Sequence, residues 1–238
     1  MLQPSLPRVA AVCIVVAAVY GSCETTAQEI PPAGYLKTEG PTEADLEAEF
    51  RRAREPLRAA PEFQGSDAAS HFRLAEALAH RGDLTGASEE YRAAINLNPE
   101  FIEAHRGLGV VLLDRHDWAG AAESLRTTVR LRPNDGETFY WLGRALMGLR
   151  DWPGAATALE AATNLRPDDA EAYADLGLVR MVQGDPTGAA DALQVAVRLK
   201  PDHAEVHRLL ETIQTFRKDP DQVASAARRI LDMIFSRE

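Results

Sequence analysis

The stretch that decides the fold is residues 136–169, which read GETFYWLGRALMGLRDWPGAATALEAATNLRPDD. Its closing motif, Leu165-Arg166-Pro167, has counterparts at a spacing of 34 residues, namely Leu97-Asn98-Pro99, Leu131-Arg132-Pro133 and Leu199-Lys200-Pro201. A fixed period of this length indicates an array of repeated supersecondary units. The period places the units at 68–101, 102–135, 136–169, 170–203 and 204–237.

The same types of side chain recur at the same offsets within each unit. Position 7 is always leucine, and position 8 is small in the first four units: Ala75, Gly109, Gly143 and Gly177. Position 20 is alanine and position 24 is a large apolar residue in the same four units, for example Ala155 and Leu159. Small residues facing large apolar ones predict a helical hairpin whose two helices touch at the small positions.

Aspartate at position 16 of every unit predicts the N-cap of the second helix. Proline at position 32 disfavours continuation of that helix and closes the unit. These features resemble the tetratricopeptide repeat (TPR), a helix-turn-helix unit of 34 residues. The resemblance implies an all-α fold, an α-solenoid of stacked hairpins in a right-handed superhelix, with repeats at 68–101, 102–135, 136–169 and 170–203. Residues 204–238 depart from the pattern at Glu211, Ala227 and Phe235, and we expect a degenerate fifth repeat or C-terminal cap there.

The composition agrees with packed helices and excludes several classes of protein. The 238 residues include 40 alanines, and alanine is the best helix former. The chain has 45% hydrophobic and 26% charged residues, which excludes wholesale disorder and a polytopic membrane protein. Its net charge of −10 argues against nucleic acid as a partner.

The N-terminus resembles a secretory signal. Val9 to Tyr20 is a run of uncharged, mostly apolar residues after Arg8, shorter than the ~20 that span a bilayer. Small residues at Thr25-Thr26-Ala27 predict cleavage before Gln28, so that residues 1–27 are a signal peptide and the mature protein is periplasmic or secreted.

Two other interpretations of this segment stay open. Gly21-Ser22-Cys23 resembles the end of a bacterial lipoprotein signal, in which Cys23 would carry the lipid, although Tyr20 stands where leucine is usual. An uncleaved anchor is the other alternative. A membrane contact is expected only through one of these two devices. Cleavage before Gln28 would remove both cysteines of the chain, Cys13 and Cys23.

Two segments connect the signal to the first unit. Residues 28–41 have the composition of a flexible tether. Residues 42–67 are expected to hold an N-terminal capping helix, with an apolar stripe that includes Phe50 and Ala53 and with Arg54 mostly outside it.

Nothing in the sequence specifies an enzyme or a cofactor site. The chain lacks a phosphate-binding G-x-x-x-x-G-K-[ST] loop, a G-x-S-x-G nucleophile elbow and an H-E-x-x-H zinc motif. His203 and His207 are spaced for one helix face, but we interpret them as packing or surface histidines rather than metal ligands. Trp118, Trp141 and Trp152 are interpreted as plugs between hairpins. We therefore predict no catalysis, no metal and no cofactor.

By resemblance to the family, unit positions 2, 5, 9 and 12 face a concave groove that binds a partner. The candidate groove residues are Phe72, Arg106, Val110, Leu113, Tyr140, Arg144, Met147, Leu178, Met181 and Arg208. Methionine adapts to varied ligands, and arginine and tyrosine anchor interfaces. We expect an extended or helical peptide with apolar side chains and at least one carboxylate. The alternative is that the chain's own N- or C-terminal helix covers part of this strip, or that part of it packs as core.

The sequence thus predicts an exported, non-catalytic adaptor or scaffold that binds a protein or peptide. A membrane-anchored lipoprotein of an envelope-assembly machine is the alternative. Homo-oligomers are possible through apolar side chains at the end of the array, such as Phe216, Ile230 and Phe235.

Overall fold

The computed structural model describes residues 48–50, 52–56, 66–216 and 219–235. The predicted signal peptide and tether lie outside these residues. The chain divides into two units, Met1–Arg52 and Ala53–Glu238, and every labelled helix belongs to the second. In the described part of the chain, all regular secondary structure is helical.

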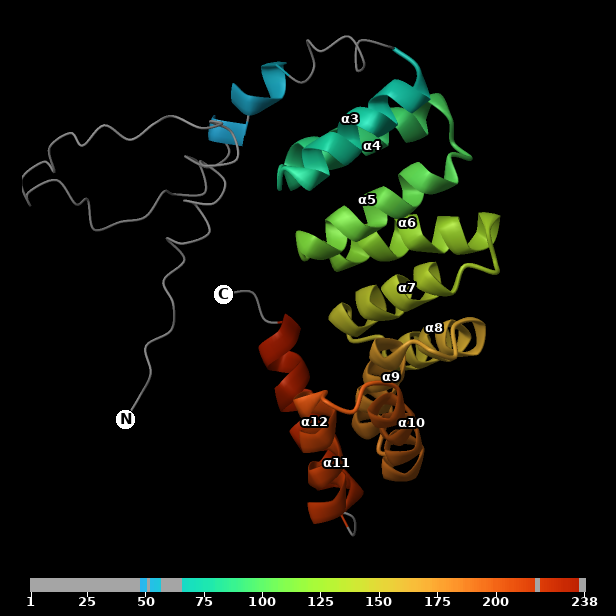
Figure 1. Cartoon of the computed structure of the whole chain (residues 1–238), viewed down its shortest axis with the longest axis vertical. Helices are drawn as coiled ribbons and strands as arrows, with labels where there is room; N and C mark the ends of the chain where they lie inside the picture. The colour runs from blue at the N-terminus through green and yellow to red at the C-terminus, as the bar shows by residue number, and fades with distance from the viewer. Residues whose placement is uncertain (1–47, 51, 57–65, 217–218, 236–238) are drawn as a thin grey trace, which may run out of the picture. The chain divides into compact units, whose positions relative to one another are not determined.

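Four antiparallel hairpins follow one another along the second unit (Figure 1). The first helix of each hairpin packs on the next helix in the chain, and each hairpin packs on the one that follows. The hairpins are α3 (Ala68–His80) with α4 (Leu84–Leu97), α5 (Ile102–Asp114) with α6 (Trp118–Leu131), α7 (Gly136–Gly148) with α8 (Trp152–Leu165), and α9 (Ala170–Val182) with α10 (Pro186–Leu199). The expected all-α stack of hairpins is confirmed.

The predicted aspartate caps are confirmed at the start of the second helices. Asp83, Asp117, Asp151 and Asp185 each accept a hydrogen bond from the backbone N–H three residues later, at 2.9 to 3.0 Å. Each bond satisfies one of the N–H groups that a helix leaves unpaired in its first turn. The caps fix where each second helix begins, and therefore the length of each turn.

The residue before each cap adopts a left-handed backbone conformation. Gly82 and Gly184 have φ of 79° and 77°, which glycine adopts without steric cost. The equivalent residues of the two middle hairpins are His116 (φ 58°) and Arg150 (φ 60°), for which this conformation is strained. In each of the two middle turns, a residue with a large side chain therefore adopts a backbone conformation that favours glycine.

Small residues let the two helices of a hairpin approach, as the repeat pattern predicts. A Cβ atom on Gly109, Gly143 or Gly177 would lie 2.6 to 2.7 Å from the Cγ atom of the leucine at position 24 of the same hairpin. Ala87, Ala121, Ala155 and Ala189 are completely buried. The side chains that meet here lie within one repeat, so each hairpin holds much of its own core.

The segment after the fourth hairpin departs from this arrangement. It forms α11 (Ala204–Thr215) and α12 (Pro220–Phe235). α11 packs on α10 as the first helix of a fifth repeat would, but α12 contacts α9 more extensively than it contacts α11. A regular second helix would pair with α11. In its described residues, the degenerate repeat or C-terminal cap expected at 204–238 therefore departs from a regular hairpin.

Arg54 does not lie outside the packed surface as the sequence predicted. Its guanidinium donates to both carboxylate oxygens of Asp83, with Nη2 to Oδ1 at 2.7 Å, and Nη1 lies 3.2 Å from Glu89 Oε2. The Arg54 side chain is 13% exposed, whereas Ala53 beside it is exposed. A forked arginine–carboxylate pair holds its partners in a defined geometry. The lead segment is thus attached to the first turn of α4.

Candidate partner-binding groove

The first helices of successive hairpins contact one another directly, α3 with α5, α5 with α7 and α7 with α9. They form one continuous face of the stack, and a pocket of about 270 Å³ opens on this face. We call it the groove pocket. It is lined by residues of α7, α9, α11 and the last turn of α12, and by the residue before α11: Tyr140, Arg144, Met147, Glu171, Ala174, Asp175, Leu178, His203, Glu205, Val206, Leu209, Ile234 and Phe235.

Asp175 is the acid at the centre of this pocket. Its side chain is 26% exposed, and Arg144 Nε lies 4.0 Å from its Oδ2 atom. Burial raises the pKa of Asp175 to about 7, opposed by the positive charge of Arg144. The nearby carboxylates of Glu171 and Glu205 add to the rise. The charge of the groove pocket therefore changes near neutral pH.

Arg144 is held by two neighbours at once. Its guanidinium carbon lies 5.9 Å from the centre of the Trp141 ring, a cation–π distance, and its Nε faces Asp175. The Tyr140 and Trp141 rings are 4.9 Å apart, and burial raises the pKa of Tyr140, which keeps its hydroxyl neutral. These contacts give the pocket mouth a fixed aromatic and cationic side.

The opposite side of the pocket is acidic and paired with bases. Glu171 accepts from Lys200 Nζ at 3.0 Å, and its other oxygen lies 3.3 Å from His203 Nε2. This ion-pair group joins α9 to the turn before α11. His203 is thus paired with Glu171 rather than with His207. The Nε2 atom of His207 lies 2.8 Å from the carbonyl oxygen of Pro201. Among the described residues, no group of three metal-ligating side chains is placed to bind a metal ion.

The predicted apolar strip is mostly not open to a partner. Leu113, Met147, Leu178 and Met181 are between 0 and 7% exposed, and only Val110 is partly accessible. α12 packs on α9, which carries Leu178 and Met181, and its Ile234 and Phe235 line the groove pocket with Met147. The expectation that this strip forms an open surface was wrong: Leu113, Met147, Leu178 and Met181 belong to the hydrophobic core, and α12 covers part of the strip near Met147 and Leu178.

Three other candidate residues have internal partners or lie apart. Phe72 packs against Tyr91 and Phe101, with ring centroids 5.9 and 5.0 Å away. Arg106 donates to Glu137 at 3.2 Å. Arg208 is exposed on α11 and does not line the groove pocket. The structure thus brings Tyr140, Arg144, Met147 and Leu178 together, and places Phe72, Arg106 and Arg208 elsewhere.

Sequence reasoning missed several pocket residues. Asp175 occupies unit position 6, which is not among the positions that the family directs into the groove. Ile234 and Phe235 enter only because α12 folds back on α9. The one available signal was the apolar stripe of α12, where Val223, Ala227 and Leu231 recur at helical spacing.

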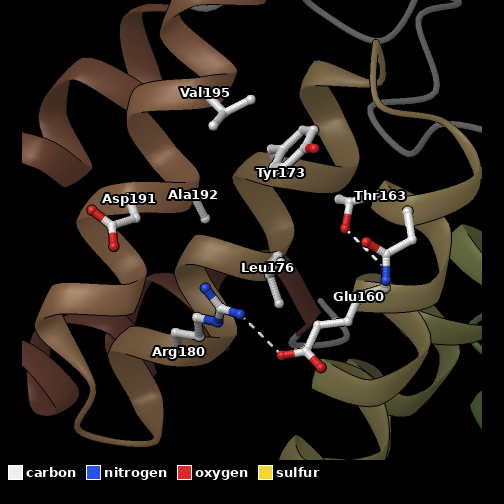
Figure 2. Close-up of a pocket in the computed structure, with 9 residues that line it drawn as sticks. Glu160, Thr163, Tyr173, Leu176, Arg180, Asp191, Ala192 and Val195 are labelled. Carbon is white, nitrogen blue, oxygen red and sulfur yellow. Dashed lines mark hydrogen bonds and ion pairs between the residues drawn. The ribbon is translucent and has the colours of Figure 1, made fainter.

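A second pocket, of about 430 Å³, lies among α8, α9 and α10 (Figure 2). Arg180 crosses it and donates to Glu160 at 3.0 Å and to the Gly188 carbonyl at 3.1 Å. Figure 2 shows Tyr173 and Leu176 of α9 between Glu160 on one side and Asp191 and Val195 on the other. Because Arg180 links these elements, this pocket is better explained as a joint between repeats.

The fold and the groove define a helical-repeat scaffold. Comparison with known families assigns the repeats: a tetratricopeptide repeat model matches residues 140–204, and a second TPR repeat model matches residues 75–115. The chain is therefore a tetratricopeptide repeat protein, of the class that serves as scaffolds for protein–protein interaction. No curated protein matches it in sequence. No described helix is both long and apolar enough to cross a membrane.

Solved structures share the fold at low identity. YrrB, described as a TPR protein with an unusual peptide-binding site, is 22% identical, with a TM-score of 0.59 over 78% of this chain and 91% of YrrB. MamA from Desulfovibrio magneticus RS-1 is 24% identical, with a TM-score of 0.61 over 72% of this chain and 96% of that one. The O-GlcNAc transferase of Thermobaculum terrenum is 24% identical over 56% of this chain and 27% of its own, with a TM-score of 0.50. Such repeats thus also occur as part of an enzyme.

Proposed function

We propose that the protein is a non-catalytic adaptor that binds an apolar segment of a partner protein in the groove pocket. The observation that carries this proposal is the pocket's make-up. Apolar side chains of Met147, Leu178 and Leu209 form part of its wall, and Arg144 and Asp175 stand beside them. Apolar walls with a few placed charges are typical of ligand sites. The peptide-binding site named for YrrB supports a peptide ligand by likeness of fold.

The charges refine the chemistry of the partner. Arg106 and Arg144 face Glu137 and Asp175, so a partner carboxylate at either arginine would compete with an internal ion pair. Glu171, Asp175 and Glu205 give the pocket more acidic than basic groups. A carboxylate of the partner therefore suits Arg144 at the edge of the pocket, and the three acids disfavour further carboxylates inside it.

We expect Arg144→Glu to weaken binding of the partner at least tenfold. The change removes the cation over Trp141, leaves Asp175 without its counter-charge and adds a fourth carboxylate to the pocket. Partners would be captured with tagged full-length protein from its own cells and identified, and their affinities measured by calorimetry. Arg130→Glu on the exposed part of α6 is the matched control. Equal affinities for wild type and Arg144→Glu would refute the groove assignment.

We also propose that the protein is exported, with cleavage before Gln28, and keep the lipoprotein form as the alternative. The support is the apolar run before Tyr20 and the small residues that follow it. The intact mass of protein purified from its own cells discriminates between the forms. A chain that begins at Gln28 is expected, a lipid on Cys23 would establish the alternative, and a chain that keeps residues 1–27 would refute both.

A further inference from the structure

α12 is held in place by the groove rather than by its neighbour in sequence. Its buried side chains, Val223, Ala224, Ala227 and Leu231, form one stripe and are 0 to 5% exposed. The helix contacts α9 more extensively than it contacts α11. Because a helix with an apolar stripe must bury it against another element, α9 supplies most of the stability of α12.

Two further contacts anchor the C-terminal end of α12. Asp232 Oδ1 accepts from Arg150 Nη2 at 2.6 Å, and the Phe235 ring meets the Trp118 ring edge-on with centroids 5.2 Å apart. Arg150 lies in the turn between α7 and α8, and Trp118 begins α6. α12 therefore reaches from the fourth hairpin to the turns of the third and second.

Both of these turns are the ones with a strained residue. His116 and Arg150 stand in the left-handed conformation where the outer hairpins have glycine. Arg150 binds Asp232, and the His116 ring packs edge-on against Trp118, which contacts Phe235. Strained residues persist where their side chains serve a function. Here Arg150 contacts α12 directly, and His116 supports Trp118, which contacts α12.

The last turn of α12 fills the groove incompletely. Ile234 lines the groove pocket and yet is 42% exposed, and Met233 is 77% exposed. The remaining space of about 270 Å³ lies between this turn and α7, α9 and α11. A helix with a larger apolar side chain at this point would bury more surface than α12 does, which favours exchange of one helix for another.

We infer that α12 is an internal occupant of a helix-binding groove, and that the partner supplies an amphipathic helix that displaces it. We expect the partner helix to share the pattern of α12. Its apolar side chains would stand at positions i, i+4 and i+8, as Val223, Ala227 and Leu231 do. An acid at i+9, like Asp232, would pair with Arg150, and an aromatic residue at i+12, like Phe235, would contact Trp118. This inference rests on the proposed function. The acid at i+9 corresponds to the partner carboxylate that the sequence predicts. It would pair with Arg150 rather than with Arg144.

The test uses a fluorescent peptide with the sequence of residues 219–238 and the full-length chain. In the release variant, Val223→Asp and Leu231→Asp remove the buried stripe of the tethered helix. We expect the release variant to bind the peptide at least about tenfold more tightly than wild type, because a tethered helix competes at high effective concentration. A peptide with the same two substitutions is the matched control and should not bind.

A milder variant guards against misfolding. Asp232→Lys with Phe235→Ala removes only the two terminal anchors and should raise the affinity for the peptide about threefold over wild type. Circular dichroism checks that the repeats stay folded. In wild type, saturating peptide should increase hydrogen exchange in α12 without changing that of α5 and α6.

Three results would overturn the inference. Equal affinity in wild type and both variants would show that α12 does not compete, while the groove would still bind a helix. A concentration-dependent dimer that loses the peptide site would assign the groove to a second copy's α12. If the peptide bound to no variant, α12 would not be able to bind the groove as a separate peptide. The proposed function would then be tested by the Arg144→Glu measurement alone.

Discussion

Gly143→Trp should lower the free energy of unfolding by ~3 kcal/mol or more, the largest effect that we expect from a single change. A Cβ atom at this position would already lie 2.7 Å from Leu159 Cγ and 2.8 Å from its Cδ2. Leu159 is completely buried, so it has no free space to move into. Thermal and urea denaturation followed by circular dichroism measure the loss.

A control and a compensating pair sharpen this result. Ala119→Trp places the same side chain on an exposed position of α6 and should change stability by less than ~0.5 kcal/mol. The pair Gly143→Ala with Leu159→Ala should cost less than the sum of the two single changes, because the new methyl group enters space that the leucine leaves. An unchanged melting temperature for Gly143→Trp would contradict the close approach of α7 and α8.

Asp175→Asn should stabilise the protein above neutral pH by roughly 1–3 kcal/mol. The folded protein binds the Asp175 proton with a pKa of about 7, against an ordinary aspartate value of 3.8, so burial of the charged form opposes folding. The folded state keeps this proton at pH values where the unfolded state has lost it. The ionisation of Asp175 therefore lowers the free energy of unfolding of the wild type as the pH rises from about 4 to about 7.

The measurement is urea denaturation of wild type and Asp175→Asn at several pH values from 4 to 8. Their difference should be close to zero near pH 4 and reach its maximum above pH 7. Asp168→Asn removes an exposed negative charge from the preceding repeat and controls for net charge. A difference that stays constant across the range would mean that Asp175 is ionised throughout, with Arg144 outweighing burial.

Much of the fold could be predicted because its contacts are local. Gly143 and Leu159 belong to one hairpin, and the Asp151 cap is three residues from the N–H that it binds. Such contacts recur with the sequence period, so the repeat pattern contains them. Arg54 was misjudged for the opposite reason, since its partner Asp83 lies outside its own helix and outside any period.

The candidate site was predicted only in part. Tyr140, Arg144, Met147 and Leu178 meet in the groove pocket, as their shared offsets suggested. The family pattern could not show that Arg144 would face Asp175, because that contact joins two different repeats. Nor could it show Arg150 as a receptor for a carboxylate, because the acid that it binds comes from α12.

The repeat pattern alone predicts the helices, their caps and the pairing within each of the four hairpins, because those interactions recur at fixed short spacings. The sequence also determined that 220–235 is amphipathic, since Val223, Ala227 and Leu231 share one face. What that face covers depends on contacts between elements far apart in the chain. A stripe of apolar residues specifies that a helix must be buried but not against which surface, and α12 packs mainly on α9 rather than on α11. Because α12 packs on α9, its last turn occupies part of the groove that the repeat pattern leaves open.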